Sequence, residues 1–217
     1  MTAAESSPLA MFPLQLAPLP DEDLPLQIFE PRYTALVRDC MREDDPRFGV
    51  VLISRGREVG GGDVRCDVGT VARITECVDL AGSGRFVLRC RTSERIRVSD
   101  WLPDDPYPRA MVRPWPDEPG EPVTAGQLEE LEHRVMGLFE RIAAARDFSL
   151  PDQAVLLGSD PDTVDPGVRL YALASRVPIG PADRYAVLSA PSAAQRLRVL
   201  SEAVDSVAAV VEFQLSE

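Results

Sequence analysis

The pattern of apolar and polar positions changes character near the middle of the chain. In the first half, short apolar runs and alternating segments predict β-strands, and the plainest alternation places Phe86, Leu88 and Cys90 on one face. In the second half, apolar residues recur every three or four positions, as on one face of a helix. The pattern therefore predicts an α+β protein, in which a β-barrel or curled antiparallel sheet is followed by an α-helical bundle.

A proline-rich segment separates the two halves. Residues 113–125 hold four prolines and three acidic residues, which is typical of a linker or a domain boundary. We therefore expect a disordered lead-in over residues 1–10, a β-rich domain over residues 11–115 and a helical domain over residues 116–217.

A strand-to-helix junction lies within residues 24–41. Pro31 suits the first turn of a helix, where its missing N–H costs nothing. The helix face is predicted to comprise Tyr33, Leu36, Val37, Cys40 and Met41. We expect Ile28 and Phe29 to enter the barrel core, and Glu30 and Arg32 to fix the turn through charge-assisted hydrogen bonds.

Capping signals mark the later helices. Thr124 with Gln127, and Ser192 with Gln195, have the spacing of capping boxes. The first of these helices is predicted to carry an apolar stripe of Leu128, Leu131, Val135, Leu138, Phe139 and Ile142. The last is predicted to carry Leu197, Leu200, Val204 and Val211.

Missing residue types exclude several kinds of chemistry. All 23 basic residues are arginine, which excludes a phosphate-binding P-loop lysine, a Ser-Lys dyad and Schiff-base catalysis. The one histidine, His133, lies in an acidic helical segment. The four cysteines form no C-x-x-C pair, so reduced structural thiols are expected rather than a zinc site. We expect no catalytic residues, no metal and no cofactor.

Charge and hydropathy limit the partners. The net charge is −12, and residues 116–217 carry 8 arginines against 17 acidic residues. This excess argues against broad attraction to nucleic acid or anionic lipid. No run of about 18 apolar residues is present, and the first ten residues lack the features of a secretory signal. We therefore expect a cytoplasmic protein.

A glycine-rich segment, residues 55–67, has two interpretations. It contains three consecutive glycines but lacks the G-x-G-x-x-G spacing and does not lead into a helix. A hairpin connection is favoured over a phosphate-binding loop.

Several motifs resemble the amino-terminal domain of Lon proteases and its stand-alone relatives. The opening block comprises Phe12-Pro13-Leu14, Leu24-Pro25-Leu26 and Ile28 to Tyr33. Further similar stretches are residues 47–53, 68–74, 84–98, 107–112 and 170–204. The resemblance covers roughly residues 11–210. It implies a PUA-like β-rich subdomain, a helical subdomain and a role in substrate recognition, without the ATPase and Ser-Lys protease modules of full-length Lon. An acidic turn at residues 19–23 departs from the apolar, glycine-containing turn of the family.

Two interpretations of the junction remain open. The first is architectural. The second is a groove for extended polypeptide or a protein partner, with the short strand near Phe12 as a candidate sheet edge. The candidate binding residues are Phe12, Leu14, Phe29, Tyr33, Trp101, Tyr107 and Trp115, and Glu30, Pro31 and Arg32 form the structural junction. The last three aromatic residues are expected to cluster near the domain boundary, either as anchors or as packing.

Two other functions are kept as alternatives. An RNA-binding protein is one, because arginines crowd the hairpin from Arg85 to Arg97. A hydrolase is the other, and only the activity of full-length relatives motivates it. The sequence leaves the ligand and the oligomeric state open, as well as any cooperation with a separate Lon protease.

Overall fold

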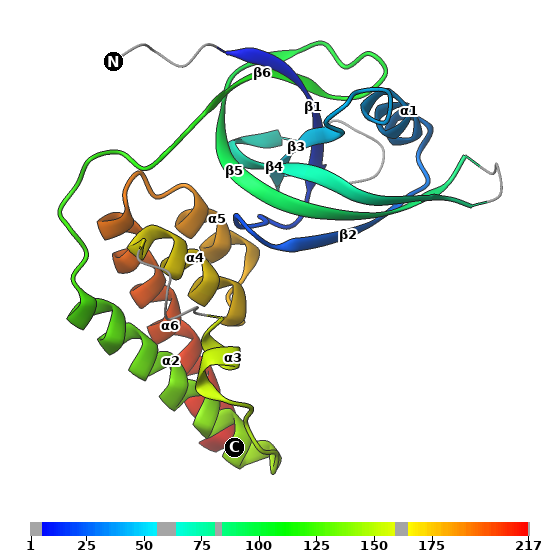
Figure 1. Ribbon diagram of the computed structural model, residues 1–217. Helices are drawn as coiled ribbons and strands as arrows, with labels where there is room; N and C mark the ends of the chain where they lie inside the picture. Colours follow the sequence, from blue (N-terminus) through cyan, green and yellow to red (C-terminus); the bar gives the residue numbers. More distant parts are fainter. Residues whose placement is uncertain (1–5, 56–63, 81–83, 159–164, 217) are drawn as a thin grey trace. The chain divides into compact units, whose positions relative to one another are not determined.

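The computed structural model describes residues 6–55, 64–80, 84–158 and 165–216 (Figure 1). Contacts between residues divide the chain into two compact units, Met1–Pro116 and Asp117–Glu217. In the described ranges, no helix is both long and apolar enough to cross a membrane. The two units are described in turn below.

The first unit is built from six strands and one helix. They are β1 (Ser7–Leu14), β2 (Asp23–Ile28), α1 (Pro31–Cys40), β3 (Arg47–Arg55), β4 (Val64–Asp79), β5 (Phe86–Leu102) and β6 (Arg109–Pro114). The sheet order is β2-β5-β4-β3-β1-β6, and β5 also pairs with β6. This second pairing closes the sheet into a barrel, around which the long β5 curves (Figure 1).

The first strand has a different role from the one predicted. β1 runs parallel to β3 from Met11 to Leu14, whereas an antiparallel barrel was expected. A parallel pair needs a long crossover, and the segment containing β2 and α1 supplies it. Ser7–Ala10 pair with β6, so the strand begins within the expected lead-in of residues 1–10. Residues 1–5 lie outside the described part of the chain.

Two apolar clusters form the interior of the barrel. The larger holds Phe12, Phe48 and Leu88 from the strands, with Tyr33 and Leu36 from α1 packed against them. Figure 1 shows α1 lying across one side of the barrel. The smaller cluster holds residues from β1, β3, β4, β5 and β6. The predicted apolar face of α1 is confirmed except at Met41, which is exposed.

The loops around β4 lie partly outside the described residues. Residues 56–63 of the glycine-rich segment are not described, and Val64–Asp67 belong to β4 rather than to a loop. Gly84, in the turn before β5, has a φ of 71°, a conformation that glycine adopts without strain.

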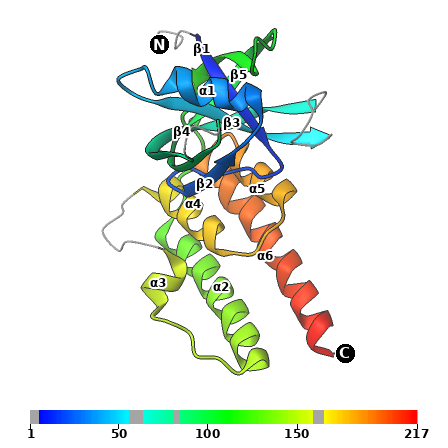
Figure 2. The same ribbon diagram turned by 90° about the vertical axis from the view of Figure 1, so that its right-hand side faces the viewer.

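The second unit is helical, as predicted. Its helices are α2 (Ala125–Arg146), α3 (Gln153–Leu157), α4 (Pro166–Arg176), α5 (Pro181–Leu188) and α6 (Ala193–Ser216). Thr124 and Gln127 form the predicted capping box at the start of α2. The Ser192 hydroxyl accepts a hydrogen bond from the Gln195 N–H, at 3.3 Å. Figure 2 shows α2 and α6 running in the same direction.

Candidate functional site

A small apolar pocket lies between β1, β2 and the start of α1. Its volume is about 180 Å³. Phe12, Leu14 and Tyr33 line it and are nearly fully buried. Phe29 lines it as well, so the pocket brings together four of the seven residues that the sequence marked as candidates.

Aromatic packing fixes the floor of the pocket. The ring centroids of Phe12 and Tyr33 lie 4.1 Å apart, and those of Phe12 and Phe48 lie 5.8 Å apart. Phe12 comes from β1 and Tyr33 from the first turn of α1, so the contact joins two segments far apart in sequence. Rings packed at this spacing leave little freedom, and the floor is formed before any ligand binds.

Glu30 of the junction lines one wall of the pocket, and its neighbours hold that wall in place. Arg32 Nε donates a hydrogen bond to Glu30 Oε2 at 3.2 Å, and the Arg32 guanidinium lies 4.5 Å from the Tyr33 ring centroid. Pro31 occupies the first turn of α1. The Thr34 hydroxyl donates to the Gly84 carbonyl at 2.7 Å, which anchors α1 to the turn before β5. The wall is therefore held by charge-assisted, cation–π and backbone contacts.

Phe29 does not enter the barrel core, contrary to the expectation. It is 54% exposed, whereas the preceding residue, Ile28, is buried. Strand alternation accounts for the difference, because neighbouring residues at the end of β2 face opposite ways. Phe29 lines the pocket at its solvent side. It is thus an exposed aromatic side chain next to a buried apolar floor.

Within the described residues, two stretches beside the pocket pair on one side only: β2, and the part of β1 from Phe12 to Leu14. β1 pairs with β6 through its first half and with β3 through its second half. In the described part of the chain, β2 pairs with β5 alone. Sequence reasoning missed Pro25, Leu26 and Gln27, which also line the pocket. The proline in β2 was the available signal, because prolines favour edge strands.

The expected cluster of Trp101, Tyr107 and Trp115 does not form. Trp101 packs against the smaller apolar cluster, with the Arg65 guanidinium 4.8 Å from its ring centroid. Tyr107 packs against the larger cluster, and its hydroxyl donates to Asp39 at 3.0 Å. Trp115 is buried beside two arginines of β5. The three residues are therefore separated because each packs against a different set of side chains in the closed barrel.

Three of the five arginines of the β5 hairpin form ion pairs with carboxylates. The ion pairs are Arg89 with Glu76 (3.5 Å), Arg91 with Asp21 (2.8 Å) and Asp23 (2.9 Å), and Arg97 with Asp67 (3.9 Å). Arg95 is buried, 4.5 Å from the Trp115 ring centroid. This pairing neutralises much of the charge that motivated the RNA-binding alternative, which stays a prediction. It also shows that the acidic turn of residues 19–23 is tied to β5.

Burial raises the pKa values of two thiols and one tyrosine of the barrel. Burial raises the pKa of the Cys40 thiol to about 11 and that of the Cys90 thiol to about 12. Burial and the hydrogen bond to Asp39 raise the pKa of Tyr107 to about 12. A neutral thiol is a poor nucleophile and a poor metal ligand. Across the described ranges, no group of three or more potential metal ligands is found.

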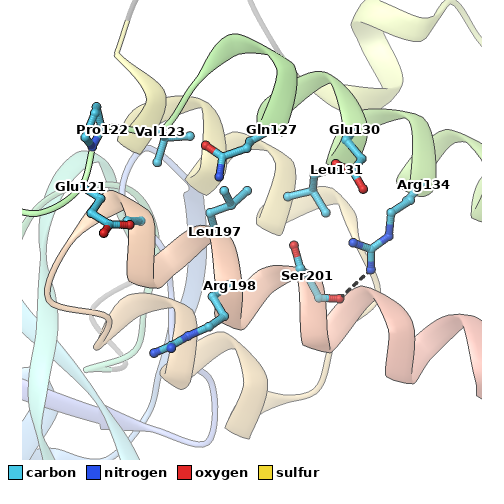
Figure 3. Close-up of a pocket in the computed structure, with 11 residues that line it drawn as sticks. Glu121, Pro122, Val123, Gln127, Glu130, Leu131, Arg134, Leu197, Arg198 and Ser201 are labelled. Atoms are coloured by element: carbon cyan, nitrogen blue, oxygen red, sulfur yellow. Dashed lines mark hydrogen bonds between the residues drawn. The ribbon is translucent and has the colours of Figure 1, made fainter.

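The helical unit contains a more polar pocket between the first halves of α2 and α6 (Figure 3). Its volume is about 350 Å³, and Leu131 and Leu197 form its apolar part. Figure 3 shows Glu130 and Arg134 on α2 and Arg198 on α6. Arg134 donates to the Ser201 carbonyl at 3.0 Å and pairs with Asp205, which ties the two helices together. None of the candidate site residues lies here.

Comparisons with known proteins agree on one relationship. Residues 8–206 match the sequence profile of the ATP-dependent protease La (LON) substrate-binding domain. The fold is similar to a structure of the Lon N-terminal domain protein from Xanthomonas campestris, with 27% identity, a TM-score of 0.60 and coverage of 89% of this chain and 96% of that one. It is also similar to the N-terminal domain of a Mycobacterium avium complex Lon protease, with 17% identity, a TM-score of 0.49 and coverage of 97% and 99%. No curated protein sequence matches the chain.

Proposed function

Because this chain belongs to the family of LON substrate-binding domains, we propose that it binds extended polypeptide without cleaving it. The matched segment, residues 8–206, covers most of the 217 residues, and the matching family model describes a substrate-binding domain. The proposed binding site is the pocket between β1, β2 and α1, called here the β1–β2 slot. The RNA-binding alternative gains no support from the paired arginines of β5.

The pairing of the strands is the observation that carries this proposal. In the described part of the chain, Phe12–Leu14 of β1 pair only with β3, and β2 pairs only with β5. The apolar pocket lies between these two strands. An extended peptide that follows a free strand edge gains main-chain hydrogen bonds, and its alternate side chains reach the pocket.

The size of the slot favours a peptide over a small-molecule ligand. Its volume of 180 Å³ is below the roughly 300–1,000 Å³ typical of pockets for drug-sized ligands. Such a space suits one apolar side chain, while the remainder of the peptide lies on the sheet edge. Phe29 at the mouth offers further apolar contact.

The residue types support binding without cleavage. The chain has no lysine, and its single histidine, His133, is exposed on α2. The buried thiols of Cys40 and Cys90 are neutral at physiological pH, because their pKa values are raised. Ser-Lys and cysteine-dependent cleavage both need groups that these residues do not provide.

Binding to a reduced and alkylated, permanently unfolded polypeptide tests the proposal. We expect fluorescence anisotropy to show binding to the unfolded chain and to apolar peptides derived from it, but not to the native form. N-methylation of alternate peptide amides removes main-chain donors and is expected to weaken binding about tenfold. Chromatography of the peptide after incubation is expected to recover it intact.

Two results would overturn the proposal. The first is equal binding of native and unfolded polypeptide. The second is peptide cleavage that disappears after substitution of a single side chain of this protein.

A further inference from the structure

A second and larger apolar groove lies between the second halves of α2 and α6, with α3 beside it. Its volume is about 730 Å³. Phe139 and Ile142 of α2, Leu156 of α3, and Val207 and Val211 of α6 contribute its apolar lining. All of these residues belong to the helical unit, so the groove, called here the α2–α6 groove, is separate from the β1–β2 slot.

The groove is lined by parts of two apolar stripes that are less buried in the second halves of α2 and α6. In the first halves of α2 and α6, Leu131, Val135 and Leu200 are buried. Further along, Phe139 and Val211 remain only half-buried. The unit thus leaves part of each stripe without a packing partner.

Large apolar side chains are exposed along the same groove. Phe148, Val210 and Leu215 line it and are 49%, 56% and 51% exposed. Single exposed apolar residues are ordinary, but a contiguous set around a groove marks an interaction site. Their arrangement argues for a macromolecular partner rather than an enclosed small ligand.

The charges that line the groove differ from those of the rest of the unit. Arg146 and Arg176 line it, together with Asp183. Within the described ranges, neither of these two arginines is paired with a carboxylate. Residues 116–217 have 17 acidic residues against 8 arginines, so a surface with more arginines than acids is a local reversal. Complementarity therefore favours a partner with acidic side chains.

The walls of the groove determine the backbone form of the partner. They are helices, whose backbone N–H and C=O groups are already bonded within each helix. A partner cannot add a strand to such walls and must be recognised through its side chains. An amphipathic helix meets this condition, because its apolar face fills a groove while its backbone is satisfied internally.

We propose that the α2–α6 groove binds an amphipathic helix of a protein partner whose apolar face is bordered by acidic side chains. The helix packs its apolar residues against Phe139, Ile142 and Val211. Its acidic residues pair with Arg146 and Arg176. This site does not depend on the β1–β2 slot, and the two are testable separately.

Three synthetic helical peptides of about four turns, roughly 14 residues, test the proposal against the full chain. The first has a leucine face bordered by glutamates. The second has lysines in place of those glutamates, and the third has glutamines in place of the leucines. We expect the glutamate peptide to bind at least tenfold more tightly than either of the others. Equal binding of the glutamate and lysine peptides, or no binding of any, would contradict the proposal.

Variants of exposed residues locate the site without disturbing the core. Val210→Glu is expected to weaken the glutamate peptide about tenfold, whereas Val168→Glu, at a residue of similar exposure on α4, leaves binding unchanged. The double variant Arg146→Glu with Arg176→Glu is expected to reverse the preference, so that the lysine peptide binds better. Arg198→Glu, in the other pocket of the helical unit, is the charge control.

Two outcomes would identify a different occupant and reject the proposal. Concentration-dependent dimerisation of the protein alone, abolished by Val210→Glu, would show that a second copy fills the groove. Displacement of the peptide by a single-chain fatty acid at low concentration would indicate a lipid site. If the protein binds the glutamate peptide as expected but does not bind unfolded polypeptide, only the proposal for the β1–β2 slot is rejected.

Discussion

Arg196, fully buried at the start of α6, donates a hydrogen bond to the carboxylate of Asp117, with 3.0 Å between Nη1 and Oδ2. A second guanidinium nitrogen donates to the other carboxylate oxygen, so the pair is bidentate. The guanidinium carbon also lies 3.8 Å from the centroid of the Tyr171 ring, and Nη1 is 3.3 Å from the Gly167 carbonyl. One arginine thus joins α6, α4 and the first residue of the helical unit.

Removing the carboxylate of this pair is expected to destabilise the helical unit. In Asp117→Ala, a buried guanidinium loses its charged partner, and we expect a loss of about 2–4 kcal/mol in the free energy of unfolding. The lower part of that range is favoured because the Asp117 side chain is 35% exposed. Urea unfolding followed by far-UV circular dichroism measures the effect on the helices.

The two tryptophans supply an internal control. Trp101 and Trp115 both lie in the barrel unit, so their fluorescence follows the unfolding of that unit. Their unfolding midpoint is expected to stay unchanged in Asp117→Ala. The exposed pair of Arg141 and Glu212 is the matched comparison, and Arg141→Ala is expected to cost less than about 1 kcal/mol. Similar losses of unfolding free energy in Asp117→Ala and Arg141→Ala would contradict the prediction that burial makes the Arg196–Asp117 pair the stronger one.

Phe29→Ser is expected to weaken binding of unfolded polypeptide about five- to tenfold, because the ring lines the mouth of the β1–β2 slot. Stability is expected to change little, since the side chain is 54% exposed. Val78→Ser, at a residue of equal exposure on β4, is the control. Anisotropy titrations with the same labelled polypeptide measure both variants. Equal affinities would place the binding site elsewhere.

Glycine at position 69 is expected to be required for the barrel. A Cβ added there would lie 2.1 Å from the Val50 carbonyl oxygen on the neighbouring strand. Because backbone atoms cannot easily move aside, Gly69→Ala is expected to cost about 3 kcal/mol or more. Tryptophan fluorescence during urea unfolding measures it.

The matched glycine lies in α2. A Cβ added at Gly137 meets no atom within 4 Å. Gly137→Ala is therefore expected to stabilise the helical unit by about 1 kcal/mol, because alanine favours the helix interior. A loss of stability in Gly137→Ala, or no loss in Gly69→Ala, would contradict this prediction.

Alkaline pH is expected to destabilise the barrel unit. The pKa of Cys90 is raised from 9.0 to about 12 by burial, so the thiol ionises in the unfolded chain before it ionises in the folded one. This difference in pKa does not affect the free energy of unfolding below about pH 9. Above it, the free energy of unfolding falls as the pH rises toward about 12. Cys90→Ala is expected to flatten this decline. Unfolding midpoints measured in steps of pH test it, and identical slopes for both proteins would contradict it.

The periodicity of apolar residues determined the elements of this protein. It predicted the α+β class, while single residue types predicted the start of α1 at Pro31 and the capping box of Thr124 with Gln127, because these features depend on residues close together in sequence. The boundary was expected after residue 115, and contacts divide the chain after Pro116. Phe12, Leu14, Phe29 and Tyr33 were chosen from motifs in one short stretch, and all of them line a single pocket.

Only the tertiary structure decided how those elements combine. Strand pairing left β2 at an edge and, within the described residues, left Phe12–Leu14 of β1 paired on one side only, since hydrogen-bonded neighbours are set by the closure of the sheet. The same closure gave Trp101, Tyr107 and Trp115 separate neighbours and matched most β5 arginines with acids distant in sequence. The α2–α6 groove arises because both stripes keep the helical period along their whole length, whereas several of their residues in the second halves of the helices are only partly buried. A one-dimensional pattern specifies which side of a helix is apolar, whereas packing in three dimensions decides where that side is covered.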